Sequence, residues 1–508
     1  MPENRQKIVI IGGGIAGLCT AAYALKCGYQ VEVIEMNDMA GGLATSWRRG
    51  AYTFETCLHW LMGSKPGGDM YADWQEILDM DKLGFVNSEE FVQMEDESGD
   101  RLTIYTNVDR LEAELLNRAP HNRAAILDLT HAVRSLGKFK MPDPSGSLKD
   151  NWRTLLRDVP YFPLLGKLSK ISGKEYAARF SDPLLRSFFA GGDMGNMSAI
   201  ALVFSLAWMN TGNAGYPIGG SQAMIRLIEE NIAELGGKIS FLSRVERILV
   251  ENDVAVGVEL EEGKTVMADW VISAADGHAT IFDMLDGKYI DPGIRRTYGE
   301  KELFPSYLQV SLGVALDLSG QPPMTTILLD SPLDVDPETQ LGHASFRFFH
   351  FDPTFAPPGK TAITSFLPTR NFAYWDDLRR TDPSGYRAEK RRVADAVVGV
   401  LEKRLPGMRA AIEVTDVATP ATVIRYTGNW KGSMEGWQIV PGASFKPFPN
   451  TLPGLNRFLM VGQWVMPGGG LPSGLLTAKI ALKAICKQDR VPFDLHAKKA
   501  MKPELVGV

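Results

Sequence analysis

The sequence predicts an α/β fold in which a parallel-sheet domain is interleaved with a second, α+β domain. Two observations carry this prediction. A continuous apolar run at residues 8–11 leads into a glycine-rich turn and an apolar-striped helix, and the same order of strand, glycine turn and helix recurs at residues 457–486. Between them, the 508 residues hold a long block of charged helical stretches and a separate β-rich block, too much chain for one small domain.

The first glycine turn lies in the stretch from residue 7 to residue 35, KIVIIGGGIAGLCTAAYALKCGYQVEVIE. Gly12, Gly14 and Gly17 fit G-x-G-x-x-G: the first allows a tight turn, the second a close approach of a pyrophosphate, and the third close helix–strand packing. Glu35 ends the second strand at the distance where an acid meets a ribose hydroxyl. An ordinary glycine-rich turn is the alternative, but the ordered context favours a Rossmann-type dinucleotide site. Glu35 would repel a 2′-phosphate, so FAD and NAD remain.

The predicted secondary structure of the middle of the chain changes twice. Residues 70–214 hold charged helical stretches such as Arg110 to Leu116 with aromatic clusters between them, which predicts a helical, substrate-facing insertion. From Gly215 a helix and four strands follow in a pattern that resumes the nucleotide domain. A β-rich block then covers residues 306–366, and a helix covers residues 386–405.

We therefore predict a discontinuous cofactor domain (residues 1–75, 215–300 and 415–490), a substrate domain (76–214 and 301–414) and a tail (491–508).

The second glycine turn distinguishes the two cofactors. An apolar strand at residues 457–461 is followed by Gly462, by a run of three glycines ending at Gly470, and by a helix that begins near Pro472. Free N–H groups at a helix N-terminus carry about half a positive charge and stabilise a neighbouring anion by ~2 kcal/mol at best. Reduced flavin carries negative charge at its pyrimidine ring, whereas NAD needs no second turn. A purely structural turn uses the same residues, but the pairing with the first turn favours FAD.

Composition excludes several function classes. The net charge of −6, from 54 basic and 60 acidic residues, gives no electrostatic reason to expect nucleic acid. The four cysteines form no C-x-x-C pair and no zinc spacing, so no metal site is expected. The first strand begins within ten residues of the start, which predicts a cytoplasmic protein. The apolar stretch at residues 199–209 is too short to span a bilayer; it fits a buried core helix, a membrane-surface segment or an apolar tunnel wall.

Several motifs together resemble one family. The N-terminal fingerprint, Gly41-Gly42, GYPIGG, VISAAD and MVGQWVMPGGGLPSGL are similar to the phytoene desaturase superfamily of FAD-dependent oxidoreductases. FETCLHWLMG (54–63) and TPATVIRYTGNWKG (419–432) resemble its carotenoid isomerase and retinol saturase branch. The resemblance implies an amine-oxidase-like two-domain fold, non-covalent FAD and an apolar substrate tunnel. It also implies a set of cofactor-binding residues: Gly12, Gly14, Ile15, Ala16, Gly17, Glu35, Met36, Gly42, Leu43, His59, Val245, Gly462, Gly469, Gly470 and Leu471.

This chain departs from the family pattern at two places. The family usually has a basic residue after the glycine pair, where Leu43 stands here. The usual Asp-Thr-Gly after the phenylalanine is Glu55-Thr56-Cys57. Both changes alter polarity and space near the flavin, and they leave room for a substrate unlike a carotenoid.

Three residues are candidates for proton transfer, because flavin itself carries the hydride chemistry. His59 belongs to the motif expected beside the isoalloxazine and exchanges protons near neutral pH. Arg425 and Tyr426 precede the last strand and are able to polarise a carbonyl or donate a proton. The structural alternatives are a packed histidine and a surface salt bridge.

Three functions remain open from the sequence. The favoured one is desaturation, saturation or isomerisation of C=C bonds in an apolar isoprenoid or lipid, with possible peripheral association with a membrane. A flavin amine oxidase is the second; that class typically needs a lysine near flavin N5, and the block from Gln309 to Leu318 has none. A flavoprotein that binds lipid or a partner without turnover is the third. With no second dinucleotide motif, NAD(P)H, quinone and oxygen all remain as redox partners.

Overall fold

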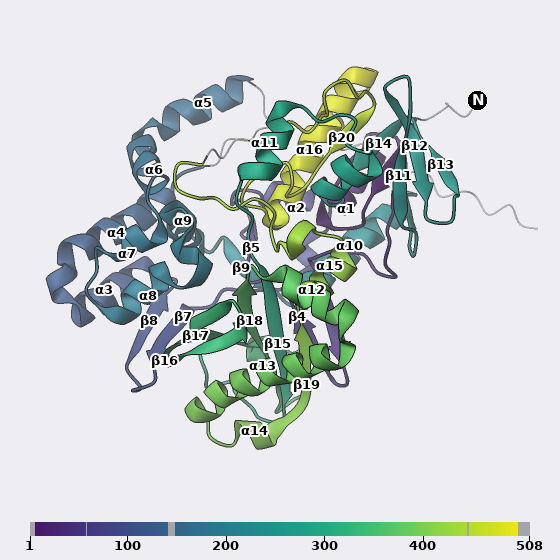
Figure 1. The fold of residues 1–508 in the computed structure, drawn as a ribbon. Coiled ribbons are helices and arrows are strands. Elements are labelled where there is room, and N and C mark those ends of the chain that lie inside the picture. Colours follow the sequence, from purple (N-terminus) through teal and green to yellow (C-terminus); the bar gives the residue numbers. More distant parts are fainter. Residues whose placement is uncertain (1–5, 57, 141–147, 444–446, 496–508) are drawn as a thin grey trace, which may run out of the picture.

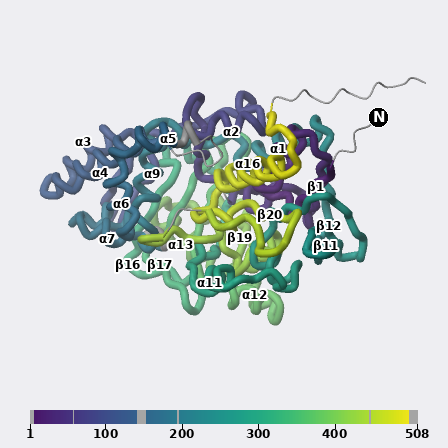
Figure 2. Tube along the Cα trace, turned by 90° about the horizontal axis from the view of Figure 1, so that it is seen from above, coloured from purple at the N-terminus to yellow at the C-terminus, as the bar shows by residue number. Residues whose placement is uncertain are grey.

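The computed structural model describes residues 6–56, 58–140, 148–443 and 447–495. Figure 1 shows a parallel sheet with its helices on one side of the molecule, and a large sheet and a cluster of helices on the other. Figure 2 shows the helical cluster at one end, the strands β11 and β12 at the other, and the first and last long helices side by side.

A five-stranded parallel sheet forms the first body, in the order β10-β2-β1-β14-β20. Its strands come from three distant parts of the chain: β1 (Lys7–Ile11), β2 (Gln30–Ile34), β10 (Lys238–Ser240), β14 (Trp270–Ser273) and β20 (Phe458–Met460). Strand β1 is apolar throughout its buried part because both of its faces are covered. Ile8 and Ile10 pack on one side with three helices: α1 (Ile15–Lys26), α10 (Gly220–Glu234) and α16 (Gly470–Asp489).

The other face of the parallel sheet is covered by a small antiparallel sheet. Val9 and Ile11 alternate with Ile8 and Ile10, as the period of two requires, and contact this second layer. The layer consists of β11 (Val245–Glu251), β12 (Val254–Leu260) and β13 (Thr265–Met267). Strand β10 ends at Ser240, two residues before Leu242, which takes a positive φ of 51° that extended strands do not adopt.

A seven-stranded sheet of order β19-β15-β18-β17-β16-β7-β8 forms the second body. Neighbouring strands are antiparallel except for β16 and β7, which pair in parallel. One face packs on the long helix α13 (Pro383–Arg404), which begins three residues earlier than the predicted helix. The strands are β7 (Glu90–Asp96), β8 (Arg101–Tyr105), β15 (Ser306–Val314), β16 (Met324–Asp336), β17 (Thr339–Phe348), β18 (Thr361–Thr369) and β19 (Ile412–Ala418), with α12 (Phe372–Thr381) and α14 (Met408–Ala411) nearby.

A cluster of helices packs at the β7–β8 end of this sheet. The apolar stretch at residues 199–209 forms α9 (Ala199–Asn210), whose buried side chains lie in the core of this cluster, as the core-helix interpretation predicts. In the part of the chain that the structure describes, no helix combines the length and apolar character that crossing a membrane requires. The other helices of the cluster are α3 (Val108–Arg118), α4 (Arg123–Leu136), α5 (Leu148–Asp158), α6 (Phe162–Leu168), α7 (Gly173–Ala177) and α8 (Pro183–Ala190).

Short elements join the two bodies. Strand β9 pairs with both β5 and β6. The chain that leads into α10 is therefore held against the two short strands that follow β4 in sequence. Of the predicted tail, Val491, Phe493 and Leu495 pack on the core beneath α1, and residues 496–508 lie outside the described ranges. These short elements are β3 (Ser46–Arg49), β4 (Tyr52–Glu55), β5 (Leu61–Met62), β6 (Phe85–Val86), β9 (Ala214–Pro217), α2 (Tyr71–Gln75), α11 (Pro292–Glu300) and α15 (Pro420–Thr427).

Candidate cofactor pocket and substrate cavity

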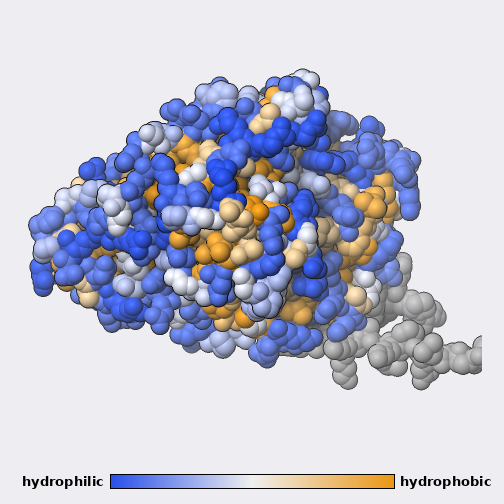
Figure 3. Space-filling view, turned by 90° about the horizontal axis from the view of Figure 1, so that it is seen from below, coloured by the Kyte–Doolittle hydropathy of each residue, from blue (hydrophilic) through white to orange (hydrophobic). Residues whose placement is uncertain are grey.

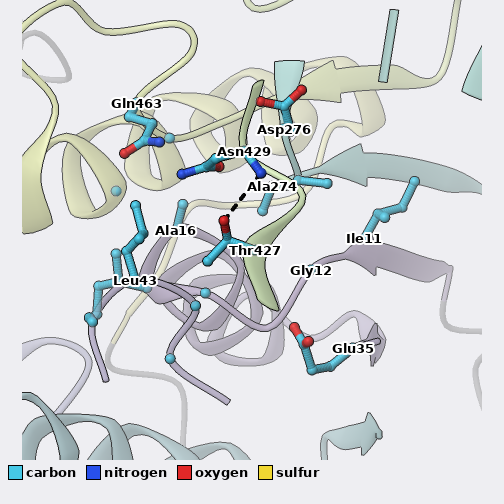
Figure 4. Close-up of a pocket in the computed structure, with 18 of the residues that line it drawn as sticks. Ile11, Gly12, Ala16, Glu35, Leu43, Ala274, Asp276, Thr427, Asn429 and Gln463 are labelled. Carbon is cyan, nitrogen blue, oxygen red and sulfur yellow. Dashed lines mark hydrogen bonds between the residues drawn. The ribbon is translucent and has the colours of Figure 1, made fainter. Parts of the chain in front are cut away.

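A long pocket lies where β1, β2, β14 and β20 end, the edge of a parallel sheet where ligands bind. In Figure 4, Glu35 lies on one side of the Gly12 turn, and Leu43 and Gln463 lie on the other. The pocket is lined by residues that follow each of these strands and by the first residues of α1 and α16.

The first glycine turn leaves backbone free for a ligand. Gly12 has a φ of 95°, a left-handed conformation that favours glycine. A Cβ on Gly14 would approach nothing closer than 3.9 Å, so this side of the turn is open. A Cβ on Gly17 would instead overlap the carbonyl oxygen of Gly12. The two glycines therefore have different tasks: Gly14 leaves room for a diphosphate, and Gly17 allows α1 to pack against the turn.

The Glu35 carboxylate fixes the same turn from the end of β2. Its oxygens accept hydrogen bonds from Gly13 N (2.7 Å), Asn37 N (2.8 Å) and Asn37 Nδ2 (2.9 Å), and the side chain is buried. Two carboxylate oxygens have about four acceptor positions. Capacity thus remains for a ribose hydroxyl in the pocket that Glu35 lines.

The second glycine turn meets the first one directly. Gly462 has a φ of 95° and donates its N–H to Thr477 Oγ1 of α16 (2.8 Å). A Cβ on Gly462 would lie 3.1 Å from the Cβ of Ala16, and one on Gly474 would lie 3.1 Å from Ala16 N. The N-terminal turns of α1 and α16, more than 400 residues apart in sequence, therefore border one pocket.

The glycine pair at residues 41–42 completes the wall. Gly41 donates its N–H to Gly13 O (2.9 Å), and both glycines have positive φ, 122° and 62°. A Cβ on Gly42 would press within 3.2 Å of the Gly14 Cα. Leu43 follows and lines the pocket. Bare backbone on both sides is what a flat, extended dinucleotide needs, so the residues present fit FAD: Glu35 at the ribose, Gly14 at the diphosphate and the start of α16 at the flavin ring.

This fold and this pocket define a flavin-dependent oxidoreductase of the dinucleotide-binding class. The chain belongs to the flavin-containing amine oxidoreductase family, whose pattern matches residues 15–485. It is an FAD-dependent enzyme, and bound flavin supplies two-electron hydride chemistry.

Relatives with known names cover nearly the whole chain. Prolycopene isomerase of Arabidopsis thaliana is 23% identical, over 100% of this chain and 86% of the relative. The neurosporene-forming phytoene desaturase of Cereibacter sphaeroides is 24% identical, over 95% of each. Among solved structures, cyclohexylamine oxidase from Brevibacterium oxydans has a TM-score of 0.60 at 14% identity, over 96% of this chain and 100% of that one. An oxidoreductase from Methanosarcina mazei has a TM-score of 0.59 at 19% identity, over 94% and 100%. The expected amine-oxidase-like fold and the desaturase–isomerase branch are confirmed.

The structure brings most of the predicted cofactor residues together, although their contacts with FAD stay predictions. Three predicted residues do not line the pocket: Gly17, which packs inside the turn, Gly469, which precedes the lining residue Gly470, and His59. The predicted residues that line it are Gly12, Gly14, Ile15, Ala16, Glu35, Met36, Gly42, Leu43, Val245, Gly462, Gly470 and Leu471.

The proposed catalytic pair Arg425 and Tyr426 lies at the ribose end of the pocket. Tyr426 lines the pocket, and its carbonyl accepts a hydrogen bond from Asn37 Nδ2 (2.8 Å), beside Glu35. Arg425 is exposed and stacks over the Tyr426 ring. This position favours a contact with the adenosine part of the cofactor. A role in proton transfer stays a prediction that the geometry does not favour.

His59 lines a second cavity of about 470 Å³, within the size range of small-molecule sites. Its side chain is accessible and faces this cavity. Burial and the nearby Arg347 charge lower the pKa of His59 to about 3. The imidazole is therefore neutral at physiological pH. The neighbouring Cys57 lies outside the described residues.

Sequence reasoning missed three charged residues of these cavities. Asp276 ends the VISAAD motif, lines the cofactor pocket and accepts hydrogen bonds from Ala279 N and Trp430 N, both at 2.8 Å. Glu435 lines the same pocket, and Arg347 lines the second cavity. Asp276 follows a strand of the parallel sheet, a signal available in the sequence. Glu435 and Arg347 carry no local motif.

Proposed function

We propose that this enzyme desaturates, saturates or isomerises C=C and C–C bonds of an apolar isoprenoid or carotenoid-like lipid. The observation that carries the proposal is the match to prolycopene isomerases and phytoene desaturases over nearly the full chain. The two cavities support it: aromatic and thioether side chains such as Trp60, Met209 and Phe351 stand on the wall of the cavity that His59 lines.

The lining of the cavities argues against amine oxidation. That class needs a lysine near flavin N5. Among the described residues, neither the cofactor pocket nor the second cavity is lined by a lysine. In β15, where the sequence also lacks lysine, the buried Gln309 amide donates to Glu55 O (3.0 Å) and Ser311 Oγ (2.9 Å).

We also propose that helices α5 and α6 rest on a membrane surface, from which the apolar substrate enters. Five large apolar side chains are exposed there, with Trp152 61% and Leu156 56% accessible, and α5 stands out from the body of the molecule in Figure 1. Arg153 on the same helix is exposed and suits an anionic lipid headgroup. A further face, seen in Figure 3, carries apolar patches among hydrophilic residues. The exposed set is Trp152, Leu155, Leu156, Val159 and Phe162.

The catalytic proposal is tested with the FAD-loaded protein and polyenes in vesicles. Prolycopene and phytoene are incubated with the enzyme in three arms: anaerobically without an acceptor, anaerobically with a quinone as acceptor, and with oxygen. We expect a changed polyene by chromatography, together with bleaching of the oxidised flavin spectrum in the arm without acceptor. An unchanged polyene in every arm, with peroxide formed from amines, would overturn the proposal in favour of amine oxidation.

The membrane proposal is tested by co-sedimentation with phosphatidylglycerol vesicles. Trp152→Glu combined with Leu156→Glu should reduce vesicle binding by on the order of tenfold or more, because two apolar anchors are lost. Met267→Glu is the matched control, since Met267 is a similarly exposed apolar residue on β13 (53%). Equal losses in both proteins, or none in either, would contradict α5 as the anchor.

A further inference from the structure

We propose that the second cavity binds the oxygenated end of the substrate, a carboxylate at one end of a polyene or isoprenoid chain, through Arg347. This inference rests on the proposed function and narrows its substrate class. The cavity opens between β7, the start of α3, and the strands β16 and β17. Arg347 lies on β17, in a strand whose neighbours Phe346 and Phe348 are fully buried.

The guanidinium of Arg347 is only partly satisfied by the protein. Its Nη1 donates to Leu58 O (3.2 Å) and its Nη2 donates to His59 O (2.6 Å). A guanidinium has five N–H donors in a fixed planar fork, so three remain for another acceptor. Three aromatic rings surround the cation, with centroids 5.1 Å (Tyr216), 5.2 Å (Phe349) and 5.8 Å (Phe351) from its central carbon.

No carboxylate of the described chain forms an ion pair with Arg347. Glu55 lies near enough to favour the charged guanidinium, but its oxygens accept hydrogen bonds from Ser221 N and Ser221 Oγ. Two acids line the cavity, Glu89 and Glu90. Glu89 is 80% exposed and pairs with Arg110 (2.7 Å). Arg347 is half-buried, and burial lowers the pKa of its guanidinium while Tyr216 and Glu55 raise it.

A carboxylate supplies what this end of the cavity lacks. It accepts two parallel N–H bonds from a guanidinium, the strong bidentate geometry. The neutral imidazole of His59 lies beside Arg347 and adds no competing charge. Trp60, Met209 and Met324 line the same cavity and offer apolar contact to a hydrocarbon chain. A pure hydrocarbon would leave three of the five guanidinium N–H groups without an acceptor from protein or substrate.

The experiment compares retinoic acid with its methyl ester as probes for the FAD-loaded enzyme. Binding is followed by quenching of tryptophan fluorescence, and Trp60 is a reporter inside the cavity. We expect the acid to bind more tightly than the ester in the natural protein. Arg347→Met should lower affinity for the acid about 10- to 100-fold and leave affinity for the ester nearly unchanged, since a hydrogen bond to a charged group is lost. Arg347→Lys should retain part of the preference.

The ratio of acid to ester affinity within each variant keeps the test valid if Arg347→Met is less stable, because both probes meet the same protein. Arg110→Met is the matched control: it removes another cation of the cavity lining and should change the ratio by less than Arg347→Met. An equal affinity for acid and ester in the natural protein, or an unchanged ratio in Arg347→Met, overturns this inference. Turnover of hydrocarbon polyenes is measured separately, so the proposed function stands or fails on its own.

A separate observation carries a second inference: we infer that the Glu435 carboxyl exchanges the substrate proton at the ring end of the cofactor pocket. Glu435 lines that pocket, and a Cβ on Gly470, at the start of α16, would lie 3.8 Å from Glu435 Oε1. The carboxyl forms no hydrogen bond or ion pair with the described residues, unlike Glu35 at the other end. Burial raises the pKa of Glu435 to about 7.

The step is balanced as follows for desaturation. Bound FAD would supply the acceptor for a hydride from one substrate carbon, and Glu435 Oε1 would accept the proton from the neighbouring carbon. The electron pair of the C–H bond that loses its proton forms the second bond of the new C=C. Saturation runs the same transfers in reverse, with the carboxyl as donor.

Glu435→Gln tests this role, with Glu435→Asp as the conservative variant. We expect Gln to lower turnover about 10²- to 10⁴-fold, to remove the limb near pH 7 from the pH–rate profile, and to leave FAD content intact. Asp should restore a titrating limb. A pH-dependence of the resting flavin absorbance near pH 7 that disappears in Gln provides a readout independent of turnover. The same profile in Gln as in the natural enzyme would overturn the inference.

Discussion

Replacing Gly17 by alanine tests whether close packing of α1 against the Gly12 turn is what shapes the cofactor site. Gly17 lies in the first turn of α1, with ordinary helical backbone, so conformational strain is not at issue. The added Cβ would overlap Gly12 O, far below the 3.0 Å at which neighbouring atoms must shift, and would lie 3.3 Å from the Ala274 side chain. The obstacle is backbone, which cannot rotate away. Overpacking of this kind costs about 1–3 kcal/mol, against a gain in helix propensity of about 1 kcal/mol.

Gly399→Ala is the matched control, because Gly399 also lies inside a helix, α13, and an added Cβ there meets nothing within 4 Å. We expect Gly399→Ala to raise the free energy of unfolding by about 0.5–1 kcal/mol. Gly17→Ala should lower it by about 1–2 kcal/mol and weaken FAD binding, because the displaced carbonyl belongs to the turn that is predicted to face the diphosphate. Urea unfolding of the apoprotein and a flavin-fluorescence titration measure the two quantities. Equal stabilisation by both substitutions, with unchanged FAD affinity, would refute the packing argument.

Three further predictions follow from the same pocket and its surroundings. Glu35→Gln replaces an acceptor-only group by one whose amide nitrogen cannot accept a hydrogen bond from a backbone N–H. Urea unfolding should show a loss of about 2 kcal/mol, and unchanged stability would contradict the bonding scheme. The carboxylates of Asp73 and Glu76 bind Lys479 Nζ, at 2.5 Å and 2.8 Å. Lys479→Met leaves both carboxylates without their cation, which should lower the free energy of unfolding by about 3–5 kcal/mol. A thermal melt with no shift would show that this ion-pair cluster does not contribute to stability. Burial raises the pKa of Asp276 to about 7, so the native protein holds a proton that the unfolded chain releases from about pH 4 upward. The contribution of Asp276 to stability should therefore be fullest below about pH 4 and be lost as the pH rises to about 7, and Asp276→Asn should remove this contribution from unfolding curves taken across that range.

The cofactor domain could be predicted because each of its two glycine turns is formed by residues close together in sequence. Gly12, Gly14 and Glu35 stand in one strand–turn–helix–strand unit, and their spacing alone indicates the turn, the open backbone and the ribose contact. The second turn, at Gly462, has the same local order of strand, glycine turn and helix. Its contact with Ala16 confirms that the two turns border one pocket.

The residues of the second cavity could not be predicted in this way. Arg347 lies on a strand 288 residues beyond His59 and donates a hydrogen bond to the His59 carbonyl. No spacing in the sequence predicts that contact. Glu435 sits in an irregular segment whose path depends on packing against the glycines that precede α16. His59 was expected beside the cofactor but lines the other cavity, because the β4–β5 connection that carries it turns toward β17. Side chains placed by tertiary contacts leave no periodic trace in the sequence.

The order of strands in the parallel sheet has a consequence for how the enzyme matures. Strand β20 and helix α16 come from the last tenth of the chain, yet they border the pocket that opens at β1. A chain without this segment lacks one wall of the pocket, so the stabilisation that bound FAD would supply requires β20 and α16 to be in place. FAD binding is therefore expected to follow the pairing of β20 with β14 and not to precede it.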